Sequence, residues 1–399
     1  MPYVTVGREN SAAIRIYYED HGSGPPVVLV HGYGLNGHSW EKQETALLAA
    51  GHRVITYDRR GFGASSRPST GYDFDTLADD LPVLLSWLDL QEVVLAGFAM
   101  GTGEVVRHLA VHGSGRVKAA VLIAPLLPFL LKTEDNPDGI DRGVLDDISA
   151  RIAADRPAAM KDFMDRSYNV DLLGGGRVSD QAWQNSFYVA ISASANAALR
   201  CVTACLEDFR GDLAMIDVPV LVIHGDQDRV LPCEATSRRL PALLKNARST
   251  IIAGGPHAII WTHADEVNQL LLDFIRAALS EESGGWLMIE VAGEGVAEST
   301  TRGCEVVAGE GGGVSGRHDA WVVGGWSVGS VGLGGEHVEA KAGKVPGIQV
   351  GVDGAEGRDR AVRGTAAHAG DGRAEGSQPE GDLGADGPGA DDAGRRAGE

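Results

Sequence analysis

Residues 93–104, VVLAGFAMGTGE, decide the fold, because a buried apolar run passes directly into a helical stretch through a glycine-rich turn. Gly97 and Gly101 stand two residues before and two residues after Ala99. This is the spacing of G-x-S-x-G, the tight strand-to-helix turn that presents a nucleophilic serine above a parallel sheet. Alanine occupies the serine position, so the turn is kept and the nucleophile is absent. The amide of Met100, at the start of the helix, is expected to donate to an oxyanion.

Outward from this turn, short β-branched runs alternate with amphipathic helical stretches. That alternation is typical of an α/β fold, with helices on both faces of a mostly parallel sheet. We predict strands over residues 14–19, 27–31, 53–58, 93–97, 117–123, 218–224 and 248–252. The predicted helices cover residues 40–50, 74–88, 101–112, 234–244 and 263–279. Pro82 falls inside the second helix and is expected to kink it, because it removes a backbone donor.

The alternation is interrupted once, between residues 126 and 213, where a helical pattern continues without a convincing strand. An insertion of this size between two central strands is expected to form a helical lid at the carboxyl edge of the sheet, where it would wall a pocket. Residues 1–280 are therefore predicted to form one domain that includes the lid.

The composition changes after Ser280, where 31 of the 55 glycines fall. Stretches there, such as GEGGGVSGRHDA at residues 309–320, are rich in Gly and bury too little apolar surface to offset the entropy of the chain. We predict that residues 281–399 are disordered. They are either a genuine extension or a frame-shifted or read-through product of a GC-rich gene.

Charge and cysteine content exclude several classes of function. The net charge of −20 argues against general affinity for nucleic acid or an anionic membrane. We see neither a signal-peptide pattern in MPYVTVGREN nor an apolar run of the ~20 residues that a membrane helix requires. Cys201 and Cys205 lack a second Cys/His pair nearby, so reduced thiols in a cytoplasmic protein, with no metal, are expected.

An acid and a base follow the last two predicted strands. Asp228 lies in HGDQDRVLP, residues 224–232, and His257 ends GGPH, residues 254–257. Together with Ala99 they keep the order nucleophile, acid, histidine that the G-x-S-x-G fold uses. We therefore predict that Asp228 orients His257 and that His257 is the base, whereas Asp226 is a turn residue.

The loop after residue 30, His31-Gly32-Tyr33-Gly34, is the third motif. Its small residues let the backbone approach a ligand, so the amide of Tyr33 is expected to be the other oxyanion donor beside that of Met100. Six residues are predicted to contact a small organic substrate. His31, Phe98, Ile259 and Trp261 belong to these motifs or follow them closely, and Leu126 and Phe129 lie in the apolar run that opens the predicted lid.

Five stretches in order carry a resemblance over roughly residues 3–279: HGYGLNGHSWE, VITYDRRGFGASS, GFAMGTGEV, PFLLKTEDNPDG and GGPHAIIWTHADEVN. In these the chain resembles the bacterial cofactor-free haloperoxidases, or perhydrolases, of the α/β-hydrolase superfamily. The resemblance implies an α/β-hydrolase fold and a Ser-Asp-His triad, with Asp228 and His257 at the acid and base positions. It also implies an esterase that accepts hydrogen peroxide, needs no cofactor and releases a peracid that oxidises halide. A homo-oligomer, namely a trimer, is implied as well.

The chain departs from that family at the decisive position, because Ala99 has no oxygen with which to attack an ester. A smaller departure is Gly34, where the family often carries proline. Loss of a triad nucleophile costs on the order of 10⁶ in turnover, so hydrolysis through an acyl-enzyme is expected to be lost. Four interpretations stay open: an engineered knock-out, an enzyme that needs only a base and an oxyanion hole, a catalytically inactive binding or accessory protein, and a degraded gene.

The second interpretation leads, since Asp228 and His257 are both retained together with the oxyanion loop. Chemistry of that kind includes proton abstraction, C–C or C–O lyase reactions and rearrangements, as in biosynthesis. An inactive protein has no chemical need for an imidazole supported by a carboxylate.

Overall fold

The computed structural model describes residues 2–137 and 139–280, followed by seven short strands between residues 289 and 366. Contacts within the chain divide it into two compact units, Met1–Glu282 and Ser283–Glu399.

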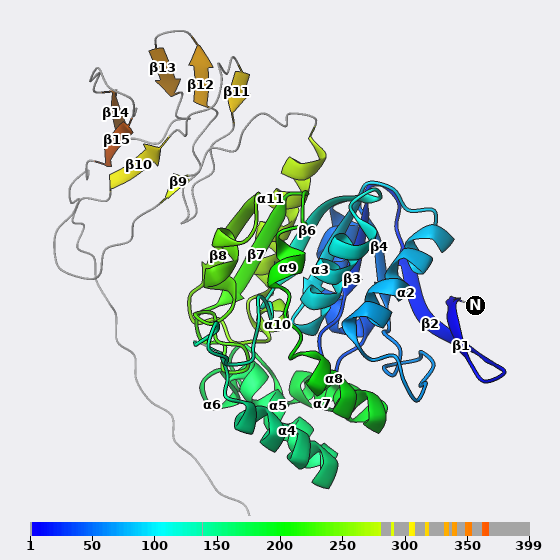
Figure 1. Cartoon of the computed structure of the whole chain (residues 1–399). Helices are drawn as coiled ribbons and strands as arrows, with labels where there is room; N and C mark the ends of the chain where they lie inside the picture. The colour runs from blue at the N-terminus through cyan, green and yellow to red at the C-terminus, as the bar shows by residue number, and fades with distance from the viewer. Residues whose placement is uncertain are drawn as a thin grey trace, which may run out of the picture. The chain divides into compact units, whose positions relative to one another are not determined.

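The first unit is built on an eight-stranded sheet with the order β1-β2-β4-β3-β5-β6-β7-β8 (Figure 1). β1 and β2 form an antiparallel hairpin, β2 is antiparallel to β4, and the strands from β3 to β8 are parallel. This arrangement confirms the predicted α/β class. The strands are β1 (Tyr3–Glu9), β2 (Ala12–His21), β3 (Pro26–Val30), β4 (Arg53–Tyr57), β5 (Val93–Phe98), β6 (Val117–Ile123), β7 (Val220–Gly225) and β8 (Ala247–Ile252).

The sequence did not predict β1. This strand lies at the edge of the sheet, and only Val4 among its residues is buried. An edge strand of this kind lacks the apolar run by which the inner strands, such as β5 with every residue buried, are found.

Helices cover the sheet on both faces (Figure 1). α2 packs beside α3, and α1 packs beside α11. The helices of this layer are α1 (Glu41–Ala49), α2 (Phe74–Trp87), α3 (Met100–His112), α10 (Ile259–Thr262) and α11 (Ala264–Leu279). α2 includes Pro82 within its length, and the kink expected there stays a prediction.

The helix predicted over residues 234–244 is wrong in type and extent. Only a short 3₁₀ helix forms there, η2 (Ser237–Ala242), and Pro241 lies inside it. Proline removes a backbone donor and disfavours the α conformation of the residue before it, so an α-helix does not propagate through this stretch.

The predicted lid lies between β6 and β7 and is helical. It comprises α4 (Arg142–Ala154), α5 (Arg156–Tyr168), α6 (Val170–Leu173), α7 (Asp180–Ser192), α8 (Ala195–Ala204) and α9 (Arg210–Leu213). α4 to α8 gather at one edge of the sheet (Figure 1). The lid has a small core of its own, in which Met160, Met164 and Tyr168 of α5 pack with Ala190 of α7.

In the second unit the described residues form two small antiparallel sheets, β14-β15-β10-β9 and β11-β12-β13. Their strands are β9 (Ile289–Glu290), β10 (Gly303–Val307), β11 (Gly316–His318), β12 (Val331–Gly334), β13 (His337–Ala340), β14 (Ile348–Val352) and β15 (Ala361–Ala366). We predicted disorder for residues 281–399. Apart from these seven strands, that prediction falls on residues outside those that the structure describes. Within the described part of the chain, no helix is long and apolar enough to cross a membrane.

Candidate active site

The turn between β5 and α3 holds Ala99 in a strained conformation. Ala99 has φ 49° and ψ −114°, a combination that L-residues rarely adopt. Side chains at Gly97 and Gly101 would clash with backbone: a Cβ on Gly97 would lie 2.6 Å from the Gly101 oxygen, and one on Gly101 would lie 2.2 Å from the Val30 oxygen. The two glycines are therefore required, and the turn keeps the tight geometry that the sequence predicts for a nucleophile position.

Asp228 and His257 meet at the carboxyl ends of β7 and β8. The Nδ1 atom of His257 lies 2.7 Å from Oδ2 of Asp228, and the His257 side chain is 4% exposed. Because an ionised carboxylate only accepts, Nδ1 carries the proton of this bond and Nε2 is the nitrogen free to accept one. The predicted hydrogen bond between acid and base is thus present.

The other oxygen of Asp228 is held by the backbone. Oδ1 accepts from the amides of Val230 and Leu231, at 2.8 and 2.7 Å. Burial acts to raise the pKa of Asp228, but the positive charge of His257 and the hydrogen bonds from His224 and His257 outweigh it and hold that pKa well below its ordinary value. Asp228 is therefore a carboxylate at neutral pH. Asp226 instead accepts from the amide of Gly254, as a turn residue does.

The loop from His31 to Gly34 packs tightly on the Ala99 turn. A Cβ on Gly32 would lie 2.9 Å from Cδ1 of Phe98 and 3.3 Å from Cβ of Ala99, so glycine allows this close packing without displacing the Phe98 ring. Among the contacts of the described residues, the amides of Tyr33 and Met100 donate to no protein acceptor. Both are free to donate to a ligand oxygen. Gly34 has φ +69°, which proline cannot adopt because its ring fixes φ near −65°.

A buried ion pair fixes this loop from beneath. Arg59 is 1% exposed and donates through Nη2 to the His31 carbonyl at 2.8 Å and through Nε to Glu104 of α3 at 2.7 Å. Its backbone amide donates to Nε2 of His31, so Nδ1 of that imidazole carries the proton and donates to the Gly32 carbonyl at 2.8 Å. Burial, with the charge of Arg59, holds the pKa of His31 well below its ordinary value and keeps it neutral.

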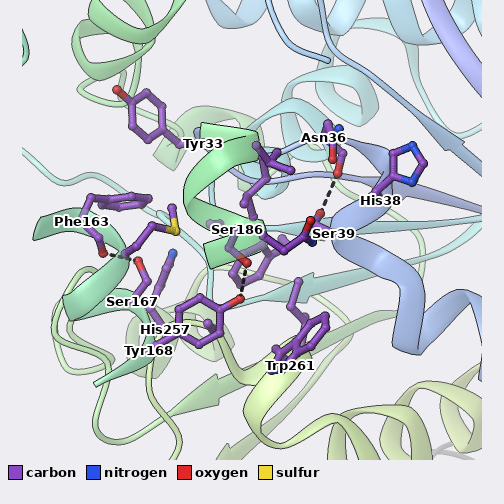
Figure 2. Close-up of a pocket in the computed structure, with 18 residues that line it drawn as sticks. Tyr33, Asn36, His38, Ser39, Phe163, Ser167, Tyr168, Ser186, His257 and Trp261 are labelled. Atoms are coloured by element: carbon purple, nitrogen blue, oxygen red, sulfur yellow. Dashed lines mark hydrogen bonds between the residues drawn. The ribbon is translucent and has the colours of Figure 1, made fainter. Parts of the chain in front are cut away.

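One cavity brings Ala99 and His257 together beneath the lid. Of the residues predicted for the site, Tyr33, Phe98, Ala99, His257 and Trp261 line it. The lid contributes Phe163, Met164, Ser167 and Tyr168 from α5 and Asn185, Ser186 and Val189 from α7. Figure 2 shows Tyr168 and Ser186 joined by a hydrogen bond among these side chains, with 2.8 Å between the two oxygens.

Four residues predicted to contact substrate do not line this cavity. His31 is held by Arg59 and Gly32, so its role is to shape the loop. Leu126 and Ile259 are 1% and 0% exposed and belong to the core of the sheet. The ring of Phe129 packs against the Arg210 guanidinium, with 5.1 Å between the ring centroid and Cζ of Arg210.

The lid residues that line the cavity and His224 were not predicted from the sequence. The members of α5 that line the cavity, Phe163, Met164, Ser167 and Tyr168, share one helix face, but spacing does not reveal which surface a face covers. His224 donates from Nε2 to Oδ2 of Asp228 at 2.9 Å. The one sequence feature that could have indicated this contact is the position of His224, four residues before Asp228.

Comparisons with known proteins show the family of the chain. The family described as "alpha/beta hydrolase fold" matches residues 25–264. The chain is 61% identical to a protein of Synechocystis sp. that is provisionally named a non-heme chloroperoxidase, over 69% of this chain and 100% of that one. It is 38% identical to the non-heme chloroperoxidase CPO-A1 of Kitasatospora aureofaciens, over 66% of this chain and 96% of the relative. A crystal structure of a bromoperoxidase from Bacillus anthracis is similar, with a TM-score of 0.65, 41% identity, and coverage of 69% of this chain and 99% of that one.

Proposed function

This chain belongs to the α/β-hydrolase fold family, in its branch of non-heme haloperoxidases, and from that premise we propose that it transforms a small organic molecule by proton transfer at His257, without a covalent acyl-enzyme. The observation that carries the proposal is the pairing of a complete acid–base couple, Asp228 and His257, with alanine at position 99 in one cavity.

The chemistry follows from what each group can do. Nε2 of His257 takes a proton from the carbon next to a substrate carbonyl. The electron pair of that C–H bond forms a C=C bond to the carbonyl carbon, and the π pair of the carbonyl moves onto its oxygen. The amides of Tyr33 and Met100 stabilise the resulting oxyanion, and the Asp228 carboxylate stabilises the imidazolium. The carbonyl then re-forms, and the imidazolium of His257 returns the proton to another atom of the substrate. Alternatively, a new double bond forms to the β-carbon and the β-substituent leaves with the electron pair of its own bond to that carbon. These outcomes are an isomerisation and a lyase reaction.

Ester hydrolysis by the usual route of the family is not available to Ala99. Removing a triad nucleophile leaves only ~10³ to 10⁴ over water from the oxyanion hole and binding. The cavity favours a small substrate with an apolar body, since Phe98, Phe163, Met164 and Trp261 line it. The Tyr168 and Ser186 hydroxyls offer that substrate a polar contact.

Deuterium exchange into a range of small molecules tests the proposal. The protein is incubated in D₂O with a panel of small ketones, esters and hydroxy acids, and incorporation at the carbon next to the carbonyl is followed by NMR. We expect exchange in proportion to protein concentration for at least one compound. It should fall by about 10²-fold or more in His257→Ala, the contribution typical of a positioned base.

His108→Gln is the matched control, because it changes a buried histidine of α3 that does not line the cavity. Equal exchange in the unaltered protein and in His257→Ala would overturn the proposal. Binding of a compound without any exchange would instead favour a binding protein.

A second candidate is an esterase or perhydrolase that has lost its serine, and the strained backbone of Ala99 favours it. A φ of 49° presents the side chain of a nucleophile toward the substrate, and an alanine has no reactive group to present. The two candidates differ in their response to Ala99→Ser. A recovered esterase should hydrolyse small activated esters, show an acyl adduct in its intact mass, and oxidise halide when peroxide is added. A base-only enzyme should gain little hydrolysis.

A further inference from the structure

A second imidazole contacts the acid of the site. His224 belongs to β7, and its side chain is 0% exposed. Its Nε2 atom lies 2.9 Å from Oδ2 of Asp228, the oxygen that also receives Nδ1 of His257 at 2.7 Å. One carboxylate oxygen therefore bridges two histidines, although the proposed chemistry uses only His257.

The carboxylate of Asp228 is fully occupied by donors. Two backbone amides donate to Oδ1, and two imidazoles donate to Oδ2. A carboxylate has about four lone-pair positions, so all of them are filled and the group has no freedom to rotate. Because the Asp228 side chain is 0% exposed, loss of any one donor would leave a buried lone pair without a partner.

The tautomer of His224 follows from this contact. To donate to a carboxylate, Nε2 must carry a proton, and neutral imidazole then has a bare Nδ1. That Nδ1 is buried and has no hydrogen-bond partner among the described residues. The titratable side chains that act on Asp228 are His224 and His257. His224 is thus committed to Asp228 and makes no other side-chain hydrogen bond in the described part of the chain.

We propose that His224 is a positioning residue, which locks the Asp228 carboxylate and limits how much of its negative charge reaches His257. The reasoning concerns charge: a donor on Oδ2 stabilises the state in which Asp228 is ionised and His257 is neutral more than the state in which His257 is protonated. Removal of that donor therefore makes protonation of His257 easier. The inference holds for either candidate function, since both use the same acid–base couple.

The test compares His224→Phe with His224→Gln. Phenylalanine keeps the ring volume and removes the donor, whereas the glutamine amide places an N–H at nearly the reach of Nε2. The readout is the pH midpoint of the His257 titration, followed by NMR of ¹³C- and ¹⁵N-labelled histidine in the otherwise unaltered protein. We expect the midpoint to move upward by about 0.5 to 1 unit in His224→Phe and to stay within about 0.2 unit in His224→Gln.

An unmoved midpoint in a folded His224→Phe would overturn the inference, and so would an equal movement in both variants. His108→Gln controls for the loss of a buried histidine remote from Asp228. If His224→Phe does not fold, the ¹⁵N shifts of His224 in the unaltered protein decide the matter: we expect Nε2 protonated and Nδ1 bare, and the opposite tautomer contradicts the inference. None of these measurements depends on activity, so failure here is distinct from failure of the proposed function.

Discussion

Ala99 occupies a backbone conformation that the rest of the turn imposes on it. Its amide donates to the Ile123 carbonyl at 2.9 Å, and its own carbonyl accepts from the amide and hydroxyl of Thr102. A non-glycine residue in such a region costs about 1 to 3 kcal/mol and persists only where its surroundings over-determine it. At the scale of one residue, the site thus retains the cost of presenting a nucleophile although the nucleophile is gone.

That strain predicts an unusual response to glycine. Ala99→Gly should change the free energy of unfolding by less than about 0.5 kcal/mol or increase it, because relief of strain offsets the lost methyl group and the added chain entropy. Ala96→Gly, in the regular and buried part of β5, should lower it by about 1 kcal/mol. Urea denaturation of both variants measures the difference. Equal destabilisation would show that Ala99 carries no strain.

At the scale of elements, strand ends and glycine-rich turns could be predicted from the sequence, and contacts across the fold could not. Asp228 and His257 follow strands of a parallel sheet, so their meeting at one edge is a consequence of topology. Leu126 follows β6 and Ile259 follows His257, but both side chains belong to the core, because position after a strand or beside a motif does not fix the direction of a side chain. The faces of α5 and α7 that line the cavity depend on how the lid docks, which no local pattern encodes.

His108 of α3 is expected to make the free energy of unfolding depend on pH. Burial, reinforced by the charge of His112, lowers the pKa of His108 to about 4. The unfolded chain takes up this proton near pH 6.5 and the native state only near pH 4, so the stabilisation is complete above about pH 6.5 and is lost as pH falls toward 4. The slope is at most about 1.4 kcal/mol per pH unit.

The measurement is the free energy of unfolding in urea at pH 7.5 and at pH 5. His108→Gln should lose less stability over this interval than the unaltered protein. His38→Gln, which changes an exposed histidine, should behave like the unaltered protein. Identical pH dependence in all three proteins would contradict the burial argument for His108.

At the scale of the whole molecule, the two units differ in what their sequences can stabilise. The core that holds the sheet, the Ala99 turn and the acid–base pair together lies within Met1–Glu282. The change in composition at Ser280 could be predicted from the sequence, because glycine and acidic residues cannot supply a core of that kind. The homotrimer that the family resemblance implies stays a prediction, with light scattering as its measurement.

Truncation after Ser280 is expected to leave folding intact. A protein of residues 1–280 should unfold cooperatively with a Tm within about 2 °C of the full chain, because the core residues of the sheet in the described part of the chain lie between Val4 and Leu279. Limited proteolysis of the full chain should give a stable fragment that ends near Ser280. Early cleavage within residues 126–213, with residues 281–399 protected, would contradict this division.

Chemical rescue tests the central claim, that His257 acts as a base in a site without a nucleophile. His257→Ala should lose deuterium exchange, and added imidazole should restore it in proportion to the concentration of the free base, because a small base can enter the space that the side chain vacates. We predict rescue in His257→Ala, which keeps Ala99. We predict no rescue in the double variant His257→Ala/Phe98→Trp, which keeps Asp228 and Met100 but in which the larger side chain blocks the cavity. A folded His257→Ala that exchanges at the unaltered rate, or that no concentration of imidazole restores, would contradict the account.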